Sequence, residues 1–223
     1  MAERKLPNLF VIGAMKSGTT SLHNWLGQHP EIFMSSVKEP GFFVEQLTWK
    51  KGWSWYQSLF ADAGDAKVIG ESSTEYTKLP YYKNVVGQIE KHAPDAKFIY
   101  LMRDPIERTI SHYWHNVRSR NKNDRRDLMT ALKNDAALIH FSNYAQQLVP
   151  YFDAFGADRV FVLTMEELLA DPQTQISKMF EWYQEDFSIN QPLIDYLNKY
   201  SNTQINDNAK ISYLEYDWNL NGI

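Results

Sequence analysis

A lysine, two glycines and a run of hydroxyl side chains lie close together near the start of the chain. The segment 13–22 reads Gly-Ala-Met-Lys-Ser-Gly-Thr-Thr-Ser-Leu and follows an apolar run at 9–12. A glycine loop that leads into a helix presents unpaired backbone N–H groups and a partial positive charge to an anion, and a lysine adds a full charge. The segment therefore predicts a phosphate site. Its candidate ligand-binding residues are Lys16, Ser17, Gly18, Thr19, Thr20 and Ser21.

One position separates this loop from the phosphate loop of nucleoside triphosphatases, which has the pattern G-x-x-x-x-G-K-[ST]. Gly13 and Gly18 have the spacing of the two glycines, but Thr19 stands in the place of the lysine. The lysine of this chain is Lys16, inside the loop. A nucleotide kinase with a rearranged loop is an alternative interpretation, and such an enzyme would require magnesium.

A second candidate anion site follows another apolar run. Asp104 and Pro105 are typical of a helix start, so Arg103 is expected at the end of a strand, at the edge of the sheet where α/β proteins bind ligands. Ser111 lies about two turns along the predicted helix, within reach of the same phosphate. An ion pair of Arg103 with Glu107 is the structural alternative. Both anion sites together would suit a nucleotide with phosphates at both ends of its ribose.

The elements that must position these residues alternate along the chain. Strands are expected at 9–12, 67–71, 97–102 and 159–163, and helices near 20–28, 52–60, 80–92, 105–119, 142–155 and 172–185. Nearly continuous apolar strands alternating with helices predict an α/β, P-loop-like three-layer fold, with a central, mainly parallel sheet and helices on both faces. The residues of helix 105–119 expected to face the core are Ile106, Ile110, Tyr113 and Val117.

Length and composition limit the class of protein. A chain of 223 residues suits one domain over 1–223, in which 190–223 is a weakly patterned tail. The chain has no cysteine, so thiolate chemistry is excluded, and its net charge of −4 disfavours a nucleic-acid partner. No apolar run approaches the length of a membrane span, and the N-terminus lacks a signal-peptide core. We therefore expect a cytoplasmic protein.

The two motifs resemble those of sulfotransferases that use 3′-phosphoadenosine 5′-phosphosulfate (PAPS), most of all the bacterial and Golgi-type carbohydrate branch that includes heparan sulfate sulfotransferases. In that family a strand–loop–helix with K-x-G-T holds the 5′-phosphosulfate end of the donor. The matching residues here are Lys16, Gly18, Thr19 and Thr20. An R-D-P motif with a serine eight residues after the arginine holds the 3′-phosphate, and Arg103 and Ser111 match it. The resemblance spans most of residues 7–185.

The resemblance implies transfer of a sulfuryl group from PAPS to a hydroxyl or amine of a carbohydrate or other small molecule, with adenosine 3′,5′-bisphosphate (PAP) as product. Lys16 would stabilise negative charge on the transferred group, and Glu39, in the segment Lys-Glu-Pro-Gly-Phe-Phe, would be the base. No metal is expected, because the donor has no polyphosphate bridge to neutralise. Gly41 departs from the pattern, since relatives often carry histidine there. No lysine stands near Ser72, where heparan sulfate enzymes can have one.

Several alternatives stay open. A module that binds PAP or PAPS without catalysis would carry the same two motifs. The aromatic residues Trp49, Trp53, Trp55 and Tyr56 suit a core cluster better than sugar stacking. His23 and His112 suit structural roles on helices better than roles as bases. A basic stretch between Arg118 and Arg126 suits a solvated junction at least as well as a site for an acidic glycan. Sugar, lipid, phenol and peptide acceptors remain possible.

Overall fold

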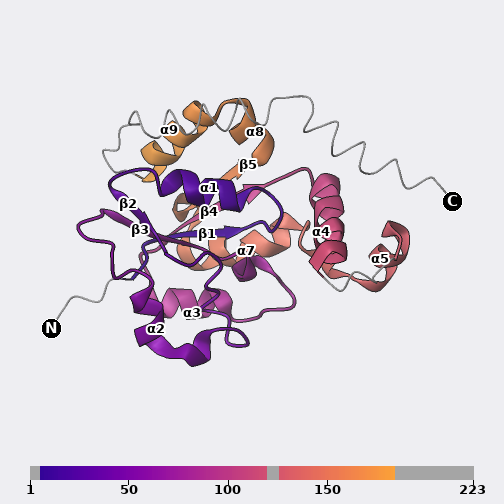
Figure 1. Ribbon diagram of the computed structural model, residues 1–223, viewed down its shortest axis with the longest axis horizontal. Helices are drawn as coiled ribbons and strands as arrows, with labels where there is room; N and C mark the ends of the chain where they lie inside the picture. The colour runs from indigo at the N-terminus through magenta and orange to yellow at the C-terminus, as the bar shows by residue number, and fades with distance from the viewer. Residues whose placement is uncertain (1–5, 120–125, 184–223) are drawn as a thin grey trace.

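The computed structural model describes residues 6–119 and 126–183. Within them, five strands form one sheet in the order β2-β3-β1-β4-β5, and every neighbouring pair is parallel (Figure 1). The strands are β1 (Leu9–Gly13), β2 (Ile32–Met34), β3 (Val68–Ser72), β4 (Lys97–Met102) and β5 (Val160–Thr164). The four predicted strands are confirmed to within one residue at each end. The edge strand β2 was missed, because a three-residue apolar run carries little periodic signal.

The helices confirm the predicted alternation and add short elements to it. The six expected helices are α1 (Thr19–Leu26), α2 (Gly52–Ser58), α3 (Val85–His92), α4 (Pro105–Ser119), α7 (Tyr144–Phe155) and α9 (Pro172–Tyr183). The structure also has α5 (Leu128–Asn134), α6 (Ala137–His140), α8 (Met165–Ala170) and the 3-10 turns η1 (Trp49–Lys51), η2 (Thr74–Thr77) and η3 (Ala157–Arg159). Most of these extra elements are too short to show helical periodicity.

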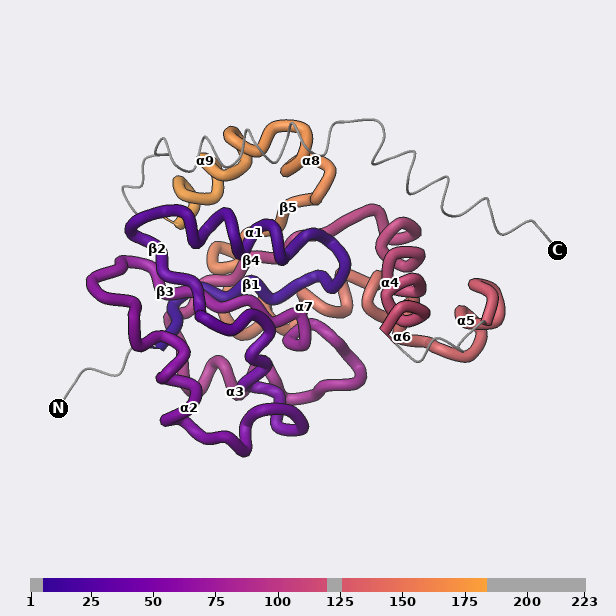
Figure 2. Tube along the Cα trace, viewed as in Figure 1, coloured from indigo at the N-terminus to yellow at the C-terminus, as the bar shows by residue number. Residues whose placement is uncertain are grey.

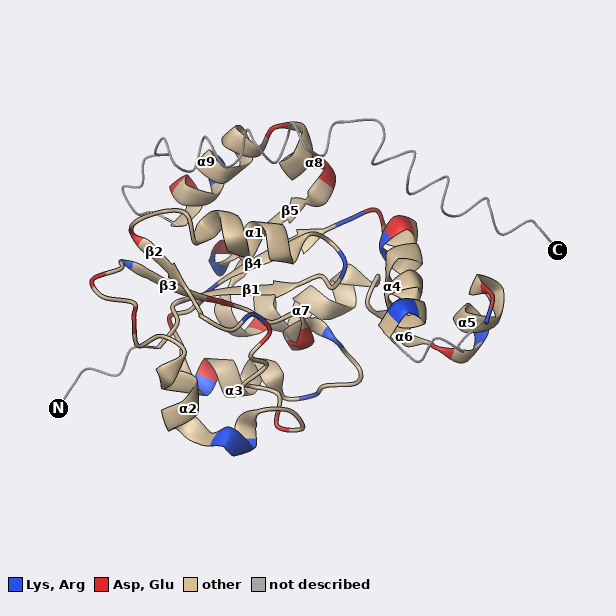
Figure 3. Cartoon of the chain, in the orientation of Figure 1, with Lys and Arg blue, Asp and Glu red and all other residues tan. Residues whose placement is uncertain are grey.

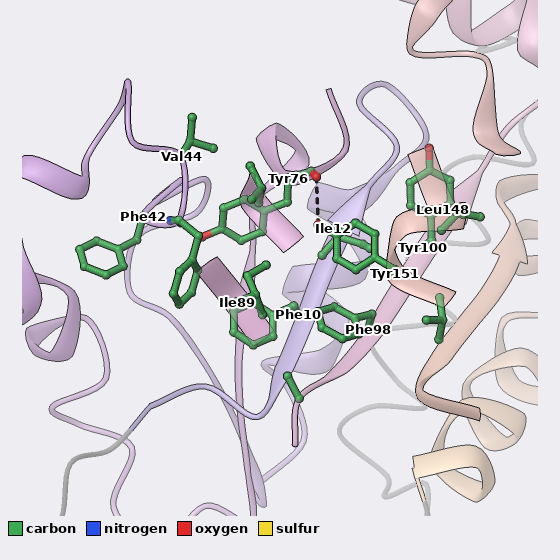
Figure 4. Close-up of a cluster of buried hydrophobic side chains, with 14 of the residues drawn as sticks. Phe10, Ile12, Phe42, Val44, Tyr76, Ile89, Phe98, Tyr100, Leu148 and Tyr151 are labelled. Carbon is green, nitrogen blue, oxygen red and sulfur yellow. Dashed lines mark hydrogen bonds between the residues drawn. The ribbon is translucent and has the colours of Figure 1, made fainter. Parts of the chain in front are cut away.

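Side chains alternate between the two faces of the sheet and so create two cores. Phe10 and Ile12 pack with residues of α2, α3 and α7, whereas Leu9 and Val11 pack with residues of α1, α8 and α9. Figure 4 shows Phe10 beside Phe98 in the first core, and Figure 2 shows the two groups of helices on opposite sides of the strands. The predicted three-layer α/β fold is confirmed.

Helix α4 packs differently from the prediction. Ile106 was expected in the core, but it is 69% exposed, whereas Arg108, Ser111 and His112 are buried. The reason is that α4 lies beside the sheet and contacts α5 and α6, where Tyr113 joins a small separate apolar cluster (Figure 1). The buried face of α4 is therefore mostly polar, and apolar spacing alone could not identify it.

Two predictions fall outside the described residues. The tail at 190–223 lies there, as does most of the basic stretch between Arg118 and Arg126. Among the residues that are described, no helix combines the length and apolar character needed to cross a membrane.

Candidate active site

The carboxyl ends of the parallel strands bring the predicted residues to one edge of the sheet. Lys16 follows β1, Glu39 follows β2 and Arg103 follows β4. The order of the sheet reverses at β1, which lies between β3 and β4. Open α/β sheets bind ligands in the crevice outside the strand ends at such a reversal. The topology therefore places both predicted anion sites and the predicted base around one position.

Two glycines shape the phosphate loop between β1 and α1. A Cβ at Gly13 would lie 2.4 Å from Thr77 Oγ1 and from a ring carbon of Tyr100, so no side chain fits there. Gly18 has φ 90° at the N-cap of α1, a conformation that favours glycine. Within the described residues no side chain caps α1, and its first turn holds no acidic residue. The N-terminus of the helix is therefore free to bind an anion.

Lys16 is held in this loop with φ 72°, and Glu39 has φ 59°. In the described part of the chain, the one other non-glycine residue with positive φ is Asn84. Such conformations cost of order 1–3 kcal/mol and concentrate at functional sites. Both predicted catalytic residues thus have backbone conformations that their own side chains disfavour.

Positive charges surround Lys16. Its pKa is lowered by burial first, and then by the neighbouring cations Arg118, Arg103 and Lys38. Figure 3 shows basic positions in the loop between β1 and α1, before α4 and along α4. Charges that repel one another in the free protein are stabilised by a shared anion. The cations near Lys16 therefore favour the binding of several phosphate or sulfate oxygens.

The other loop residues present different groups. Thr20 is exposed and Ser21 is half-buried, while Thr19 is 5% exposed. Ser17 is fully buried: its side chain lies beside the Tyr144 hydroxyl, and its N–H donates to Ala14 O at 3.2 Å. Ser17 therefore supports the loop from within, while the following turn faces outward.

Arg103 lies between β4 and α4, and Ser111 lies on α4. The Arg103 guanidinium contacts Glu107 Oε2 at 3.2 Å, which is the ion pair of the structural alternative. Glu107 is 58% exposed, and exposed pairs of this kind contribute about 0–1 kcal/mol. A doubly charged phosphate can replace such a partner. Ser111 is buried on the same helix, with 5% exposure.

Glu39 is anchored by the segment after β3. Its Oε2 accepts from Thr74 N at 2.6 Å and from Thr74 Oγ1 at 3.1 Å, and its Oε1 pairs with Lys38 Nζ. Burial raises the pKa of Glu39, but contacts with Glu75, Lys38 and Thr74 outweigh it and lower the pKa overall. The side chain is 31% exposed. Its carboxylate is therefore partly open to solvent, and its ionised form is favoured.

A buried glutamate that sequence reasoning missed supports this loop. Glu71 accepts from the hydroxyls of Tyr56 and Tyr76, both at 2.7 Å, and from Ser73 Oγ at 3.0 Å. Ser73 Oγ in turn accepts from Gly41 N at 2.9 Å. Burial raises the pKa of Glu71 to about 7. A charged residue at the end of the apolar run at 67–71 was the signal for it.

Arg108 is the second residue that was missed. It is fully buried and donates to Ser142 Oγ at 2.5 Å, to Leu138 O at 2.5 Å and to Met15 O at 3.5 Å. Burial lowers its pKa to about 10, so it remains charged at neutral pH. It links α4, which carries Ser111, to the phosphate loop, and it adds a further positive charge behind the site.

The histidines and the tryptophans have structural contacts. Burial lowers the pKa of His23 to about 4 and that of His112 to about 3, so neither is a base matched to neutral pH. His23 Nδ1 lies 2.9 Å from Ser72 Oγ. Trp49 and Trp53 pack on Phe42, with ring centroids 5.0 and 4.9 Å away. These contacts favour the core interpretation of the aromatic cluster.

A parallel sheet with an open phosphate loop at its reversal point defines a P-loop-like phosphate-binding protein. Residues 6–217 match the family model described as "Sulfotransferase domain". The chain therefore belongs to the sulfotransferase domain family, and the nucleotide-kinase alternative is not supported. The predicted family is confirmed.

Individual relatives agree with this result. The chain is 26% identical over 183 residues to heparan sulfate glucosamine 3-O-sulfotransferase 3A1 of Mus musculus. The aligned region covers 79% of this chain and 45% of that protein. The chain thus spans about half the length of this curated relative. The heparan sulfate-like branch predicted from the motifs is in accord with this similarity.

Solved structures share the fold. A sulfotransferase from Alicyclobacillus acidocaldarius superposes with a TM-score of 0.73 at 23% identity, covering 90% of this chain and 93% of that one. The mouse sulfotransferase SULT7A1, solved in complex with PAP, gives a TM-score of 0.59 at 16% identity, covering 87% of this chain and 63% of that one. At these identities the similarity concerns the fold.

Proposed function

We propose that this chain transfers a sulfuryl group from PAPS to a hydroxyl or amine of a carbohydrate or other small molecule. The observation that carries the proposal is the electrostatic coupling of Lys16 to Arg103, Arg118 and Lys38, beside the carboxylate of Glu39. A cationic pocket next to a carboxylate suits a polyanionic donor and an acceptor that must lose a proton.

The donor would bind at both anion sites. Lys16 and the amides at the start of α1 would hold the 5′-phosphosulfate, and Arg103 with Ser111 would hold the 3′-phosphate. The PAP complex of the similar mouse sulfotransferase supports PAP as the nucleotide product. Metal-free chemistry and a cytoplasmic location belong to the same proposal.

Each reacting group then has a stated role. Lys16 stabilises the charge that develops on the sulfuryl oxygens as the sulfur leaves the phosphate. Glu39 takes the proton from the acceptor, so that its oxygen or nitrogen can attack the sulfur. The protein holds both partners in line, since little covalent chemistry is required of its side chains. The similar enzyme of Mus musculus is named a heparan sulfate glucosamine 3-O-sulfotransferase, which supports a glucosamine-containing glycan as the acceptor.

Ligand binding tests the donor. PAP should raise the melting temperature more than 5′-AMP does, because 5′-AMP lacks the 3′-phosphate that Arg103 and Ser111 would bind. ATP with magnesium should have the smallest effect. Stabilisation by ATP with magnesium alone would contradict the donor assignment and favour the kinase alternative.

The variant Glu39→Gln tests catalysis. Removal of a general base reduces turnover by about 10²–10⁴-fold. We expect that loss in an assay of sulfuryl transfer from PAPS over a panel of glycan, phenol and alcohol acceptors, with PAP affinity unchanged. Wild-type chain that binds PAP but turns over no acceptor would instead identify a binding module.

A further inference from the structure

A second carboxyl group lies against the proposed base. Glu75, in the turn η2, directly follows Thr74. Thr74 holds Glu39 Oε2 through both its N–H and its hydroxyl. Oε1 of Glu75 accepts from Lys78 Nζ at 2.8 Å. Its Oε2 is buried and receives no hydrogen bond from a donor in the described part of the chain. One oxygen of Glu75 is thus left without a proton donor.

Glu75 follows Thr74, which holds Glu39 Oε2, and the Glu39 and Glu75 side chains shift each other's pKa. Ionised carboxylates only accept hydrogen bonds, so the two groups can bond to each other only once a proton lies between them. A lysine flanks each end of the pair: Lys38 contacts Glu39, and Lys78 contacts Glu75. The side chains are 31% and 19% exposed, so the Glu39 end is the more open to an acceptor.

The loop that carries Glu39 leaves space for this pair. Gly41 is buried, and a Cβ built there would lie 3.2 Å from Leu47 Cδ1 and 4.0 Å from Glu75 Cγ. A larger side chain at position 41 would extend into the region that Glu75 occupies. Because Gly41 has no side chain, it leaves room for the side chain of Glu75, which comes from η2.

We propose that Glu75 is the positioning residue of the base, and that the proton removed from the acceptor is held between the Glu39 and Glu75 carboxyl groups. This inference rests on the proposed function. In the step, the acceptor O–H bond breaks and its electron pair forms the new O–S bond. The S–O bond to the 5′-phosphate breaks, and its electron pair leaves on PAP. The proton becomes the bridge of the pair and is later released to water.

Sharing makes the pair a stronger base than Glu39 alone. The first proton added to two adjacent carboxylates removes their repulsion, so it binds more tightly than to a single group. Burial first, and then the contact with Glu39, raise the pKa of Glu75. Lys38 opposes a rise in the pKa of Glu39, and Lys78 opposes the rise in the pKa of Glu75.

The variant Glu75→Gln removes the second carboxyl while keeping its size. We expect kcat at pH 7 to fall about tenfold, which is less than the 10²–10⁴-fold loss on removal of a general base, because Glu39 is still present. The acidic limb of the pH profile of kcat/KM should move about one unit to lower pH, because the proton is no longer shared by two carboxyl groups and Glu39 titrates as a single group. PAP affinity should stay unchanged, since the ion pair of Glu75 is with Lys78, which is not among the residues proposed to bind the donor.

Two further variants fix the sign of the effect. Lys78→Met removes the cation that favours ionised Glu75, so the acidic limb should move to higher pH. Glu45→Gln is the matched control: Glu45 is exposed and bonds to Gln88, and its loss should leave the profile unchanged. An acidic limb that stays at the wild-type pH in both Glu75→Gln and Lys78→Met would overturn the proposal, even if the rate falls.

A measurement without turnover separates this inference from the proposed function. In a carbon-13 NMR titration of the PAP complex, Glu39 should titrate in two coupled steps in the wild type and in one step in Glu75→Gln. Identical Glu39 curves in both proteins would overturn proton sharing. Coupled curves in a chain that transfers no sulfuryl group would overturn the proposed function, and with it the use of the pair as a base.

Discussion

Two helices begin at the same edge of the sheet, and their first turns differ. At the start of α8, Thr164 Oγ1 accepts from Glu167 N at 3.1 Å, and Glu167 Oε2 accepts from Thr164 N at 3.0 Å. This capping box satisfies backbone donors with the helix's own side chains. At the start of α1 the N-cap is Gly18, and among the described residues no side chain replaces the missing cap.

The charges differ in the same way. The first turn of α8 contains Glu166 and Glu167, which neutralise the positive end of the helix dipole. The start of α1 instead has Lys16 in the loop and further cations around it. At this edge of the sheet, α8 is therefore capped by its own side chains, whereas the positive end of α1 next to Lys16 is left for an anion.

The largest effect is expected from Lys16→Ala. Loss of a group that stabilises transition-state charge reduces turnover by about 10²–10³-fold. The melting temperature of the free protein should not fall, because neighbouring cations disfavour the Lys16 charge in the free state. Transfer assays and thermal unfolding check both parts. Wild-type turnover in this variant would contradict the role of Lys16.

Thr20→Glu would give α1 the acidic first turn of α8. Thr20 is exposed in the first turn, so the new carboxylate should stabilise the free protein by about 0.3–1 kcal/mol. The same charge should repel the donor and weaken PAP binding about 100-fold. Calorimetry measures both quantities, with Thr20→Gln as the uncharged control. PAP binding of wild-type strength would show that the nucleotide does not use this helix end.

The pH dependence of PAP affinity should follow Lys16. A phosphate binds the protonated amine better, so affinity is full below the pKa of Lys16 and falls as the pH rises through it. Because burial and neighbouring cations lower this pKa, the fall should begin at a lower pH than for an ordinary lysine. Titrations from pH 7 to 10 measure it. The dependence should disappear in Lys16→Ala; its persistence there would assign it to another group.

The smallest effect is expected at α8. Thr164→Ala removes the cap and should lower the free energy of unfolding by about 1 kcal/mol. PAP affinity should not change, because α8 satisfies its own donors. Chemical denaturation and PAP titration together measure the contrast, and Thr164→Ser should behave like the wild type. Weaker PAP binding in Thr164→Ala would erase the distinction between the two helix starts.

Much of the fold could be predicted from the sequence, because long apolar strands and long helices have strong periodic signals. Strand β4 and helix α4 have the predicted bounds. The missed β2 has three residues and α6 has four, which is too few for a period to show. Helix α8 could have been found from its Thr-x-x-Glu capping box.

The candidate site was predictable where chemistry depends on sequence spacing. The phosphate loop and the Arg-Asp-Pro helix start could be identified in this way. The support of Glu39 could not, because Thr74 and Glu75 lie 35 and 36 positions away along the chain and meet Glu39 only through the pairing of β2 with β3. Arg108 was hidden for a related reason: its partners on α6, in the following turn and in the phosphate loop are not visible in the spacing of α4.

Arg108 also bears on how the proposed site selects its ligand. Its guanidinium bonds to the backbone of the phosphate loop and to Leu138 O on α6, so it connects the two proposed anion positions through one side chain. The distance between the two positions is then set by the fold and not by the ligand. A nucleotide with a single phosphate would bind at one of the two positions and leave the positive charge at the other position without an anion.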